Sequence, residues 1–318
     1  MAGEAVHVLD LLAATHKHYI KKVADNISDE SVLLNQLIKK GRLRDNKGGQ
    51  SIRLDVKSSE SSGVSGWNAY DLITFEAENL HSQPDWDWRG LKHSYIVAKM
   101  DVMKNKGDGQ IYDYHKRKMD DMVTDFKQGY NAELYSTSTN NSIDGLAAFN
   151  TNSATYAGIA QGTYSWWNVQ RVNGDLGANT TFATDYKERL TTALVACMRG
   201  ENGKKNQVDI GITDATAWAL VDSGLTANQR YGETSMVEAG FQNFSWNGVP
   251  MYFDRDVTAG DWHLLNLDKM ELWTGHKGLY DTESETKLSP VSMVGVILTM
   301  HQLVVKSLRN QGLIFNCD

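Results

Sequence analysis

The sequence predicts an α+β protein, in which helices and runs of strands occupy different parts of the chain. Apolar residues three and four positions apart predict one unusually long helix at residues 110–136. Strict alternation of apolar and polar residues predicts a strand at residues 51–57. Short apolar runs separated by turn residues fill the C-terminal third of the chain, and they predict several further strands.

The composition is that of a folded protein with an acidic balance. The chain has 318 residues, of which 41% are hydrophobic and 22% are charged, and its formal net charge is −7. This length allows a large core, and the composition argues against a disordered chain. The acidic balance argues against a protein that works mainly by gripping nucleic-acid phosphates, because that requires a dense Lys/Arg surface.

The first part of the chain, residues 1–45, has a helical pattern. A first apolar stripe consists of Val8, Leu9, Leu12, Tyr19, Ile20 and Val23. A second helix is predicted to begin at Ser28 as N-cap, with Ile27 and Val32 as a hydrophobic staple, and to end at residues 39–41. Neither stripe has an evident partner nearby, so we expect a helical arm that buries its apolar face on something else, such as another subunit.

A long β-loop is predicted to follow. The alternating strand at 51–57 leads into a Ser- and Gly-rich tip at 58–66, and a second extended run returns at 70–76. A two-stranded hairpin of this kind is marginally stable alone, so we expect another part of the molecule or a neighbour to cover it.

A strand at residues 95–102 is predicted to precede the long helix. The apolar face of that helix consists of Ile111, Met119, Met122, Val123, Phe126, Tyr130 and Leu134. At 1.5 Å per residue, the helix would be on the order of 40 Å long.

The uncharged stretch at residues 154–167, ATYAGIAQGTYSWW, could be an aromatic binding platform or an internal connection. Its position between two helices favours a connection. We expect Gly158 and Gly162 to allow close backbone approach. The aromatic residues expected to pack against this backbone are Tyr156, Trp166 and Trp167.

The next part of the chain predicts an α/β unit. The apolar side of a helix at 185–199 consists of Tyr186, Leu190, Leu194, Cys197 and Met198. A strand at 208–213 and a helix at 214–225 follow. Asn247-Gly248 predicts a tight hairpin with a type I′ turn, and two more strands are predicted around 262–267 and 270–274.

The most apolar run of the chain lies at residues 291–305. It is shorter than a membrane span, it contains His301 and Gln302, and it is rich in β-branched residues, so it predicts a buried strand. A last short strand is predicted at 313–316. With Glu4 where a basic region belongs, the N-terminus does not have the pattern of a secretory signal.

No catalytic, cofactor-binding or metal-ligating residue is predicted. GENGKK at 200–205 lacks the glycine spacing and the hydroxyl residue of a phosphate-binding loop, and GVSG at 63–66 is one residue short of a nucleophile elbow. His16 and His18 diverge on a helix. Asp85 and Asp87 in DWDWR are interpreted as surface ion-pair partners. The cysteines, Cys197 and Cys317, form neither a disulfide framework nor a zinc motif and fit a reducing compartment.

The nine tryptophans are dispersed along the chain. They are Trp67, Trp86, Trp88, Trp166, Trp167, Trp218, Trp246, Trp262 and Trp273. Most lie in predicted strands or beside turns, so packing or subunit contact explains them better than stacking on a sugar or a base.

Three local sequences, in their order along the chain, resemble the major capsid proteins of tailed bacteriophages, which share the Hong Kong ninety-seven fold. IDGLAAFN followed by ATYAGIAQGTYSWW resembles the segment after the long helix of these proteins, with Ala157 where a glycine is common. VDIGITDATAWALVDSGL resembles a strand and helix of their axial domain. FSWNGVPMYFDRDV followed by WHLLNLDKMELW resembles the hairpins that close that domain.

The resemblance covers nearly the whole chain and implies a division into parts. Residues 1–45 would be an N-terminal arm and 46–94 an extended β-loop. Residues 95–167 and 275–318 would form a peripheral domain, whose spine helix lies at about 110–136. Residues 168–274 would form an α/β axial domain.

The resemblance also implies a function without chemistry. Copies of the chain, as hexamers and pentamers, would assemble in the host bacterial cytoplasm into the icosahedral head shell of the virion, which encloses double-stranded DNA in non-specific proximity. The implied partners are a separate scaffolding protein, a portal and a decoration protein, with no membrane and no cofactor. Because little chain precedes the loop, we expect either a separate scaffolding protein or a chain that has already been trimmed. Lys57 near the loop tip has no assignable crosslinking partner.

Three alternatives remain open. An encapsulin-type nanocompartment shell has the same fold and would need an inner groove for cargo. An aromatic-rich glycan-binding module would be a monomer retained on a carbohydrate column. A hydrolase is the weakest alternative, because no nucleophile can be paired with a base.

Overall fold

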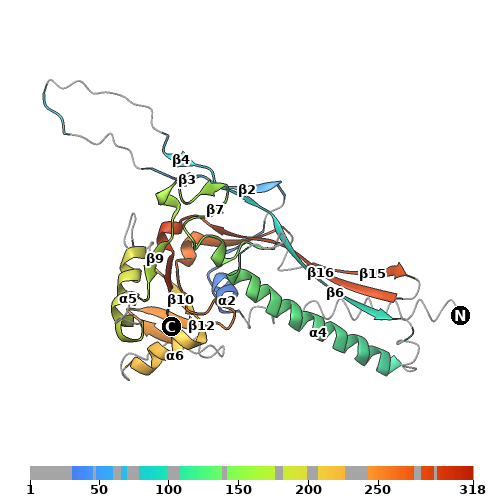
Figure 1. Cartoon of the computed structure of the whole chain (residues 1–318). Helices are drawn as coiled ribbons and strands as arrows, with labels where there is room; N and C mark the ends of the chain where they lie inside the picture. The colour runs from blue at the N-terminus through green and yellow to red at the C-terminus, as the bar shows by residue number, and fades with distance from the viewer. Residues whose placement is uncertain are drawn as a thin grey trace.

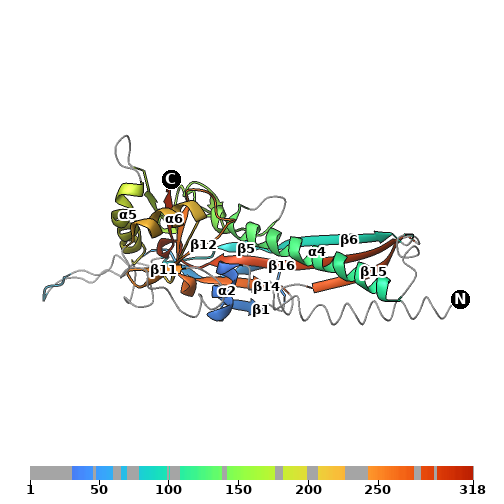
Figure 2. The same cartoon turned by 90° about the horizontal axis from the view of Figure 1, so that it is seen from below.

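The structure is a computed structural model of the chain. It describes residues 31–45, 48–59, 66–69, 79–98, 100, 108–137, 142–175, 182–198, 207–225, 243–275, 281–289 and 292–317. Within these ranges the chain forms two main sheets, a long helix and a set of small two-stranded sheets. Figures 1 and 2 show a lobe that contains α5, α6 and β12, and an arm in which α4 runs beside β6, β15 and β16.

The arm is built on a five-stranded sheet. Its order is β1-β14-β16-β15, and β6 pairs with the other edge of β16. The strands are β1 (Leu43–Asp45), β6 (Arg89–Ala98), β14 (Met270–Thr274), β15 (Asp281–Ser289) and β16 (Ser292–Val305). The predicted apolar strand at 291–305 is thus confirmed as β16, the strand that joins all the others except β1. The strand predicted at 95–102 begins earlier, at Arg89, because β16 provides a pairing partner along its whole length.

The lobe is built on a six-stranded sheet with the order β11-β12-β10-β13-β17-β9. The strands are β9 (Gln170–Asn173), β10 (Ile210–Thr213), β11 (Asn243–Trp246), β12 (Val249–Phe253), β13 (Trp262–Leu265) and β17 (Gly312–Phe315). The resemblance implies that the last strand belongs to the peripheral part, but β17 pairs with β13 and β9 and so lies in this sheet.

Alternate residues of the six-stranded sheet enter two different cores. Met251, Trp262 and Leu264 pack with the buried faces of α5 (Phe182–Cys197) and α6 (Ala215–Gly224). Tyr252 and Leu265 pack instead with α2 (Val32–Lys39) and α4 (Asp108–Tyr135). The sheet is therefore a layer buried on both faces.

The long helix α4 has 28 residues and confirms the helix predicted at 110–136. Its described apolar face is buried, as predicted, through Met122, Val123, Phe126, Tyr130 and Leu134. Figure 2 shows α4 lying along the arm sheet and reaching the lobe at its C-terminal end. The helix therefore connects the two sheets through one continuous core.

The second of the two helices predicted at residues 1–45 packs in the body of the molecule. Its N-cap is Ser31, whose hydroxyl accepts a hydrogen bond from the Leu34 N–H, so the N-cap predicted at Ser28 is wrong. Val32 through Leu37 are all buried in the core of this same chain. The expectation that this helix buries its face on another subunit is also wrong. The end at residues 39–41 is confirmed, and Gly41 takes the left-handed conformation (φ 63°) that favours glycine after a helix. The first predicted stripe, residues 8–23, lies outside the described residues.

The lobe confirms most of its predicted elements. Asp214 caps α6 through the Thr216 N–H. Asn247 and Gly248 both have positive φ, of 50° and 81°, as a type I′ turn requires. In α5 the predicted apolar face is buried except at Met198, which lies just beyond the helix and is 40% exposed.

Three small two-stranded sheets complete the fold. They are β2 (Ser51–Arg53) with β5 (Asp85–Asp87), β3 (Val56–Lys57) with β4 (His81–Ser82), and β7 (Thr155–Tyr156) with β8 (Ile159–Ala160). The single strand predicted at 51–57 is broken into β2 and β3, and the second run predicted at 70–76 lies outside the described residues. Short 3-10 helices occur at Leu146–Ala148, Ser165–Trp167, Leu267–Lys269 and Leu308–Asn310.

Candidate assembly surfaces

The residues weighed for chemistry in the sequence do not come together. Asp85 accepts a hydrogen bond of 2.8 Å from the guanidinium of Arg53. Hydrogen bonds from Ser51 and Arg53 lower the pKa of Asp85, as expected for an ion-pair partner. Cys197 and Cys317 are both buried and form no disulfide. The motifs at 200–205 and 16–18 lie outside the described residues, as do residues 63–65 of GVSG.

The described residues contain neither a candidate metal site nor a helix that could span a membrane. In these ranges no group of three or more His, Cys, Asp and Glu side chains could hold a metal ion. None of the described helices has the length and apolarity that crossing a membrane requires.

The base of the extended β-loop is fixed to the body by an aromatic contact. Trp86 in β5 is buried, with ring centroids 6.2 Å from Tyr156 and 6.4 Å from Trp167. The Asp85 N–H donates to the carbonyl of Ala157 at 3.0 Å. These contacts attach the base of the loop to the body through β5. In Figure 1, β3 and β4 lie at the same base. Trp67, in the described segment beyond the base, is 76% exposed.

The stretch at 154–167 is an internal connection, as the sequence favoured. Tyr156 and Trp167 are buried with their rings 6.1 Å apart. The Tyr156 hydroxyl donates to the carbonyl of Leu303 in β16, and the Trp167 indole N–H donates to the carbonyl of Tyr156. Gln161, fully buried, donates to the carbonyls of Phe149 and Trp167. These contacts leave no platform for a ligand on the two inner rings.

The glycines of this stretch play a different part from the one predicted. A side chain at Gly158 or Gly162 would meet no atom within 4 Å, so neither position reflects close backbone approach. Gly158 is favoured instead by its positive φ of 75° in the β7–β8 turn. Ala157 beside it also has positive φ, 51°, a conformation that favours glycine over alanine.

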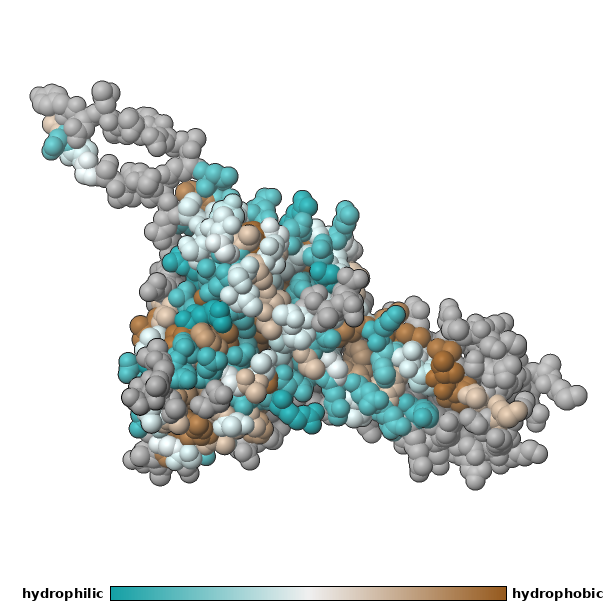
Figure 3. Space-filling view, viewed as in Figure 1, coloured by the Kyte–Doolittle hydropathy of each residue, from teal (hydrophilic) through white to brown (hydrophobic). Residues whose placement is uncertain are grey.

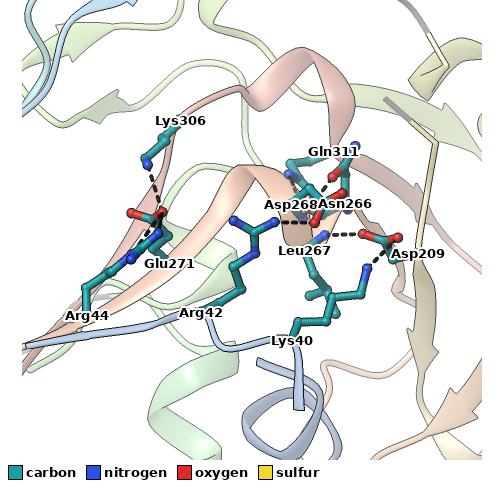
Figure 4. A network of polar contacts seen from close by, with 10 residues as sticks. All are labelled: Lys40, Arg42, Arg44, Asp209, Asn266, Leu267, Asp268, Glu271, Lys306 and Gln311. Carbon is teal, nitrogen blue, oxygen red and sulfur yellow. Dashed lines mark hydrogen bonds and ion pairs between the residues drawn. The ribbon is translucent and has the colours of Figure 1, made fainter. Parts of the chain in front are cut away.

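An ion-pair network clamps the segment after α2 onto the strands of both sheets (Figure 4). Lys40 pairs with Asp209 at 2.6 Å, and Arg42 pairs with Asp268. Asp209 in turn accepts from the Leu267 N–H. The backbone continues the attachment, because β1 pairs in parallel with β14.

Glu271 is the buried centre of this network. Its side chain is only 3% exposed, and it pairs with Lys306 at 2.8 Å and with Arg44 at 3.4 Å. The Trp273 indole N–H donates to its second oxygen. Burial raises the pKa of Glu271, but Lys306, Trp273 and Arg44 outweigh burial, so the net pKa is lowered. The carboxylate is therefore held in its charged form, and through Arg44 it ties β1 to β14.

The arm presents an apolar face to solvent. Ile96 of β6 is 64% exposed, and Leu298 and Met300 of β16 are also exposed. Val97, Ile297 and Thr299, the neighbours of these residues along the same strands, are buried. Successive side chains of a strand point to opposite faces, and the register of β6 with β16 puts Ile96 on the same face as Leu298 and Met300. The exposed residues therefore share the outward face of the sheet. Figure 3 shows apolar side chains gathered on the arm in this region. An exposed apolar face on a projecting element is typical of a protein–protein contact.

Of the nine tryptophans, four are buried, four are half-buried and one is exposed. Trp86, Trp167, Trp246 and Trp262 are buried, which confirms packing for these four. In the described part of the chain, Trp67 is the only tryptophan among the exposed large hydrophobic residues. The structure thus offers no stacked row of exposed rings within the described residues.

Comparison with known proteins finds similarity at the level of structure alone. No protein-family model matches the sequence, and neither does any curated protein. The capsid asymmetric unit of cyanophage A-1(L) matches 87% of this chain and 90% of its own, with 18% identity and a TM-score of 0.66. The capsid of a native GTA particle matches 88% and 89%, with 12% identity and a TM-score of 0.59.

A third similar structure is a cellular shell. The holo-SrpI encapsulin complex from Synechococcus elongatus matches 89% of this chain and 87% of its own, with 12% identity and a TM-score of 0.54. The capsid of the myovirus XM1 is similar at a TM-score of 0.57. In each case the likeness extends over most of both chains. The chain therefore has the Hong Kong ninety-seven fold, the fold of tailed-phage major capsid proteins.

Proposed function

We propose that the chain is a structural major capsid protein of a tailed bacteriophage. Copies of it assemble into the icosahedral shell of the virion head around double-stranded DNA. The observation that carries this proposal is the similarity to capsid chains over nine-tenths of their length. The fixed loop base, the projecting arm and its apolar face supply the kind of surfaces that assembly needs.

Within that function, the parts of the chain receive names. We assign the loop at 46–94 as the extended β-loop, 95–167 with β15 and β16 as the peripheral domain, and 168–274 as the axial domain. Sheet membership suggests three adjustments. Residues 32–45 join the body instead of a separate N-terminal arm, β14 joins the peripheral domain, and β17 joins the axial domain.

The proposal assigns the chain no catalytic role. Its partners are further copies of itself in hexamers and pentamers, together with a scaffolding protein, a portal and a decoration protein from separate genes. Assembly takes place in the cytoplasm of the host bacterium. Many contacts of modest strength close the shell, because linked contacts reinforce one another.

Electron microscopy of the expressed full-length chain, with and without a co-expressed scaffold, tests the proposal. We expect closed shells or capsomers. Dispersed monomers under both conditions would overturn it.

A variant pair tests the arm face as a subunit contact. Ile96→Asp should keep the native circular dichroism spectrum, because the side chain is exposed, and should abolish particles. Ile96→Leu, the matched control, should restore assembly. Normal particles from Ile96→Asp would remove this face from the interface.

The similarity to the SrpI encapsulin supports the alternative that the chain forms a nanocompartment shell. The contents of purified particles separate the two: packaged DNA after phage infection supports the capsid, whereas a co-purifying enzyme supports the nanocompartment. The glycan-binding alternative finds little support, because four of the tryptophans are in the core.

A further inference from the structure

A buried carboxylate joins α4 to the six-stranded sheet. Asp254 directly follows β12 and is 6% exposed. It accepts hydrogen bonds from the Asn131 amide at 2.9 Å and from the Tyr135 hydroxyl at 3.0 Å, both on α4. The Asp256 N–H donates to it at 3.1 Å. Since the Asp254 N–H itself donates to the carbonyl of Thr213 in β10, this one residue ties the helix to two strands.

We infer that Asp254 is a proton-sensitive joint between α4 and the six-stranded sheet: protonation removes the cost of its buried charge and stabilises the closed joint, although the hydrogen bonds from Asn131 and Tyr135 are then weaker. All three groups that donate to the carboxylate are neutral. A charge buried among neutral donors is costly, because hydrogen bonds only partly replace the lost hydration.

The charged groups around the joint do not supply a compensating cation. Asp256 adds a second carboxylate, which accepts from the same Asn131 amide at 2.7 Å. Arg255 points to Asp256, at 3.8 Å, and is largely exposed. From α4, Lys127 lies one turn before Asn131; it makes a contact of its own and does not contribute to the pKa shift of Asp254.

The neighbouring strands contribute acidic and neutral groups. Asp214 follows Thr213 and caps α6, and Asp261 accepts from the Thr213 hydroxyl through its carbonyl. His263 of β13 packs on Tyr135 with ring centroids 6.4 Å apart. Burial lowers the pKa of His263 to about 4, so this ring is neutral above that pH.

The direction of the pH effect follows from the linkage between protonation and stability. Burial, chiefly, raises the pKa of Asp254 above its ordinary value of 3.8, and the donors from Asp256, Asn131 and Tyr135 oppose the rise. A carboxyl group whose pKa is raised on folding stabilises the fold at low pH. That stabilisation is lost as the pH rises through the folded-state pKa.

The joint matters because α4 is also tied to the arm. The Tyr130 hydroxyl lies 2.8 Å from His301 Nδ1 in β16, one turn before Asn131 and Tyr135 make their contacts with the lobe. The C-terminal part of α4 thus bonds to both sheets. Protonation of one group would set how firmly arm and lobe are connected.

The variant Asp254→Asn tests the joint in the full-length chain, because it keeps the shape and removes the charge. The ratio of its folding equilibrium constant to that of the unmodified protein should rise between about pH 4 and pH 7, measured by urea denaturation. Asp125→Asn, an exposed change on α4, should give a constant ratio. Parallel pH profiles for Asp254→Asn and the unmodified protein would overturn the inference.

A second measurement needs no variant and decides the question if Asp254→Asn does not fold. Amide hydrogen exchange in residues 249–257, corrected for the intrinsic effect of pH, should be slower at about pH 5 than at about pH 7, relative to residues 262–265. Equal protection at both pH values would overturn the joint. The inference does not rest on the proposed capsid function, since both measurements concern contacts within one chain, whatever microscopy shows of assembly.

Discussion

Glu271 and Asp254 are two buried carboxylates that the molecule satisfies in opposite ways. Glu271 sits between Lys306 and Arg44, and its pKa is lowered. Asp254 has neutral donors, and its pKa is raised. Glu271 ties β1 to β14 and stabilises the fold at neutral and alkaline pH. Asp254 joins α4 to the lobe, and it stabilises the fold more at acidic pH. Burial alone therefore does not decide how a carboxylate affects stability: the charge of its partners does.

The change with the largest expected effect removes the core that both regions share. Phe126 is buried on α4, 6.0 Å from the Tyr130 ring. Phe126→Asp places an unpaired charge there and should cost more than about 4 kcal/mol, enough to prevent folding. Soluble expression and circular dichroism measure the outcome. Gln128→Asp, exposed on the same helix, should fold; equal losses for both variants would contradict the assignment of the buried face.

Glu271→Gln breaks the charged side of the comparison. Lys306 and Arg44 lose their shared partner, but both are partly exposed and regain water. We therefore expect a loss of about 2 kcal/mol at pH 7, below the usual cost of splitting a fully buried pair. Because the pKa of Glu271 is lowered, the stabilisation is present above the ordinary pKa of 4.5 and is lost as the pH falls through the folded-state value. Urea denaturation should show the cost of this variant shrinking in acid.

Tyr135→Phe weakens the neutral side of the comparison. It removes the hydroxyl that donates to Asp254 and leaves a buried oxygen without that donor. The expected cost is about 1–2 kcal/mol at pH 7, and it should be smaller near pH 4, where the carboxyl is protonated more often. The same denaturation series measures it. A cost that stays the same down to about pH 4 would show that Asp254 remains charged in the fold.

Asp268→Asn should have the smallest effect and sharpens the role of burial. The Arg42–Asp268 pair belongs to the same network as Glu271, but the two side chains are 24% and 40% exposed. Solvent screening reduces such pairs to about 0.2–1 kcal/mol. A loss as large as that of Glu271→Gln would mean that the network acts as one unit, and a double variant would then show strong non-additivity.

Local sequence signals predicted much of the fold. The spacing of apolar residues predicted α4, the Asn247-Gly248 pair predicted its hairpin, and the helix predicted at 214–225 is observed as α6. Each depends on residues close together in the chain, where backbone preferences act directly. The absence of a predicted catalytic site stays a prediction, since the similar structures concern the fold.

The remaining features depend on contacts between distant residues. β15 consists mostly of polar residues, and it forms because β16 pairs with it. The helix predicted from Ser28 has its N-cap at Ser31, since Ser28, Asp29 and Ser31 are all of residue types favoured as N-caps. Neither Glu271 nor Asp254 carries a local signal, because their partners lie on other elements. The buried roles of Glu271 and Asp254 could therefore not be predicted from the sequence.

The position of β17 has a consequence for the order in which the chain can fold. The strand lies between β13 and β9, and in the described part of the chain β9 has no other strand neighbour in its sheet. Gln170 must therefore wait for Gly312, far later in synthesis, before it gains its ladder partner. Pairings of such sequence separation close slowly. During translation the lobe would expose the unpaired edge of β13, a period when early association between nascent subunits is a kinetic hazard.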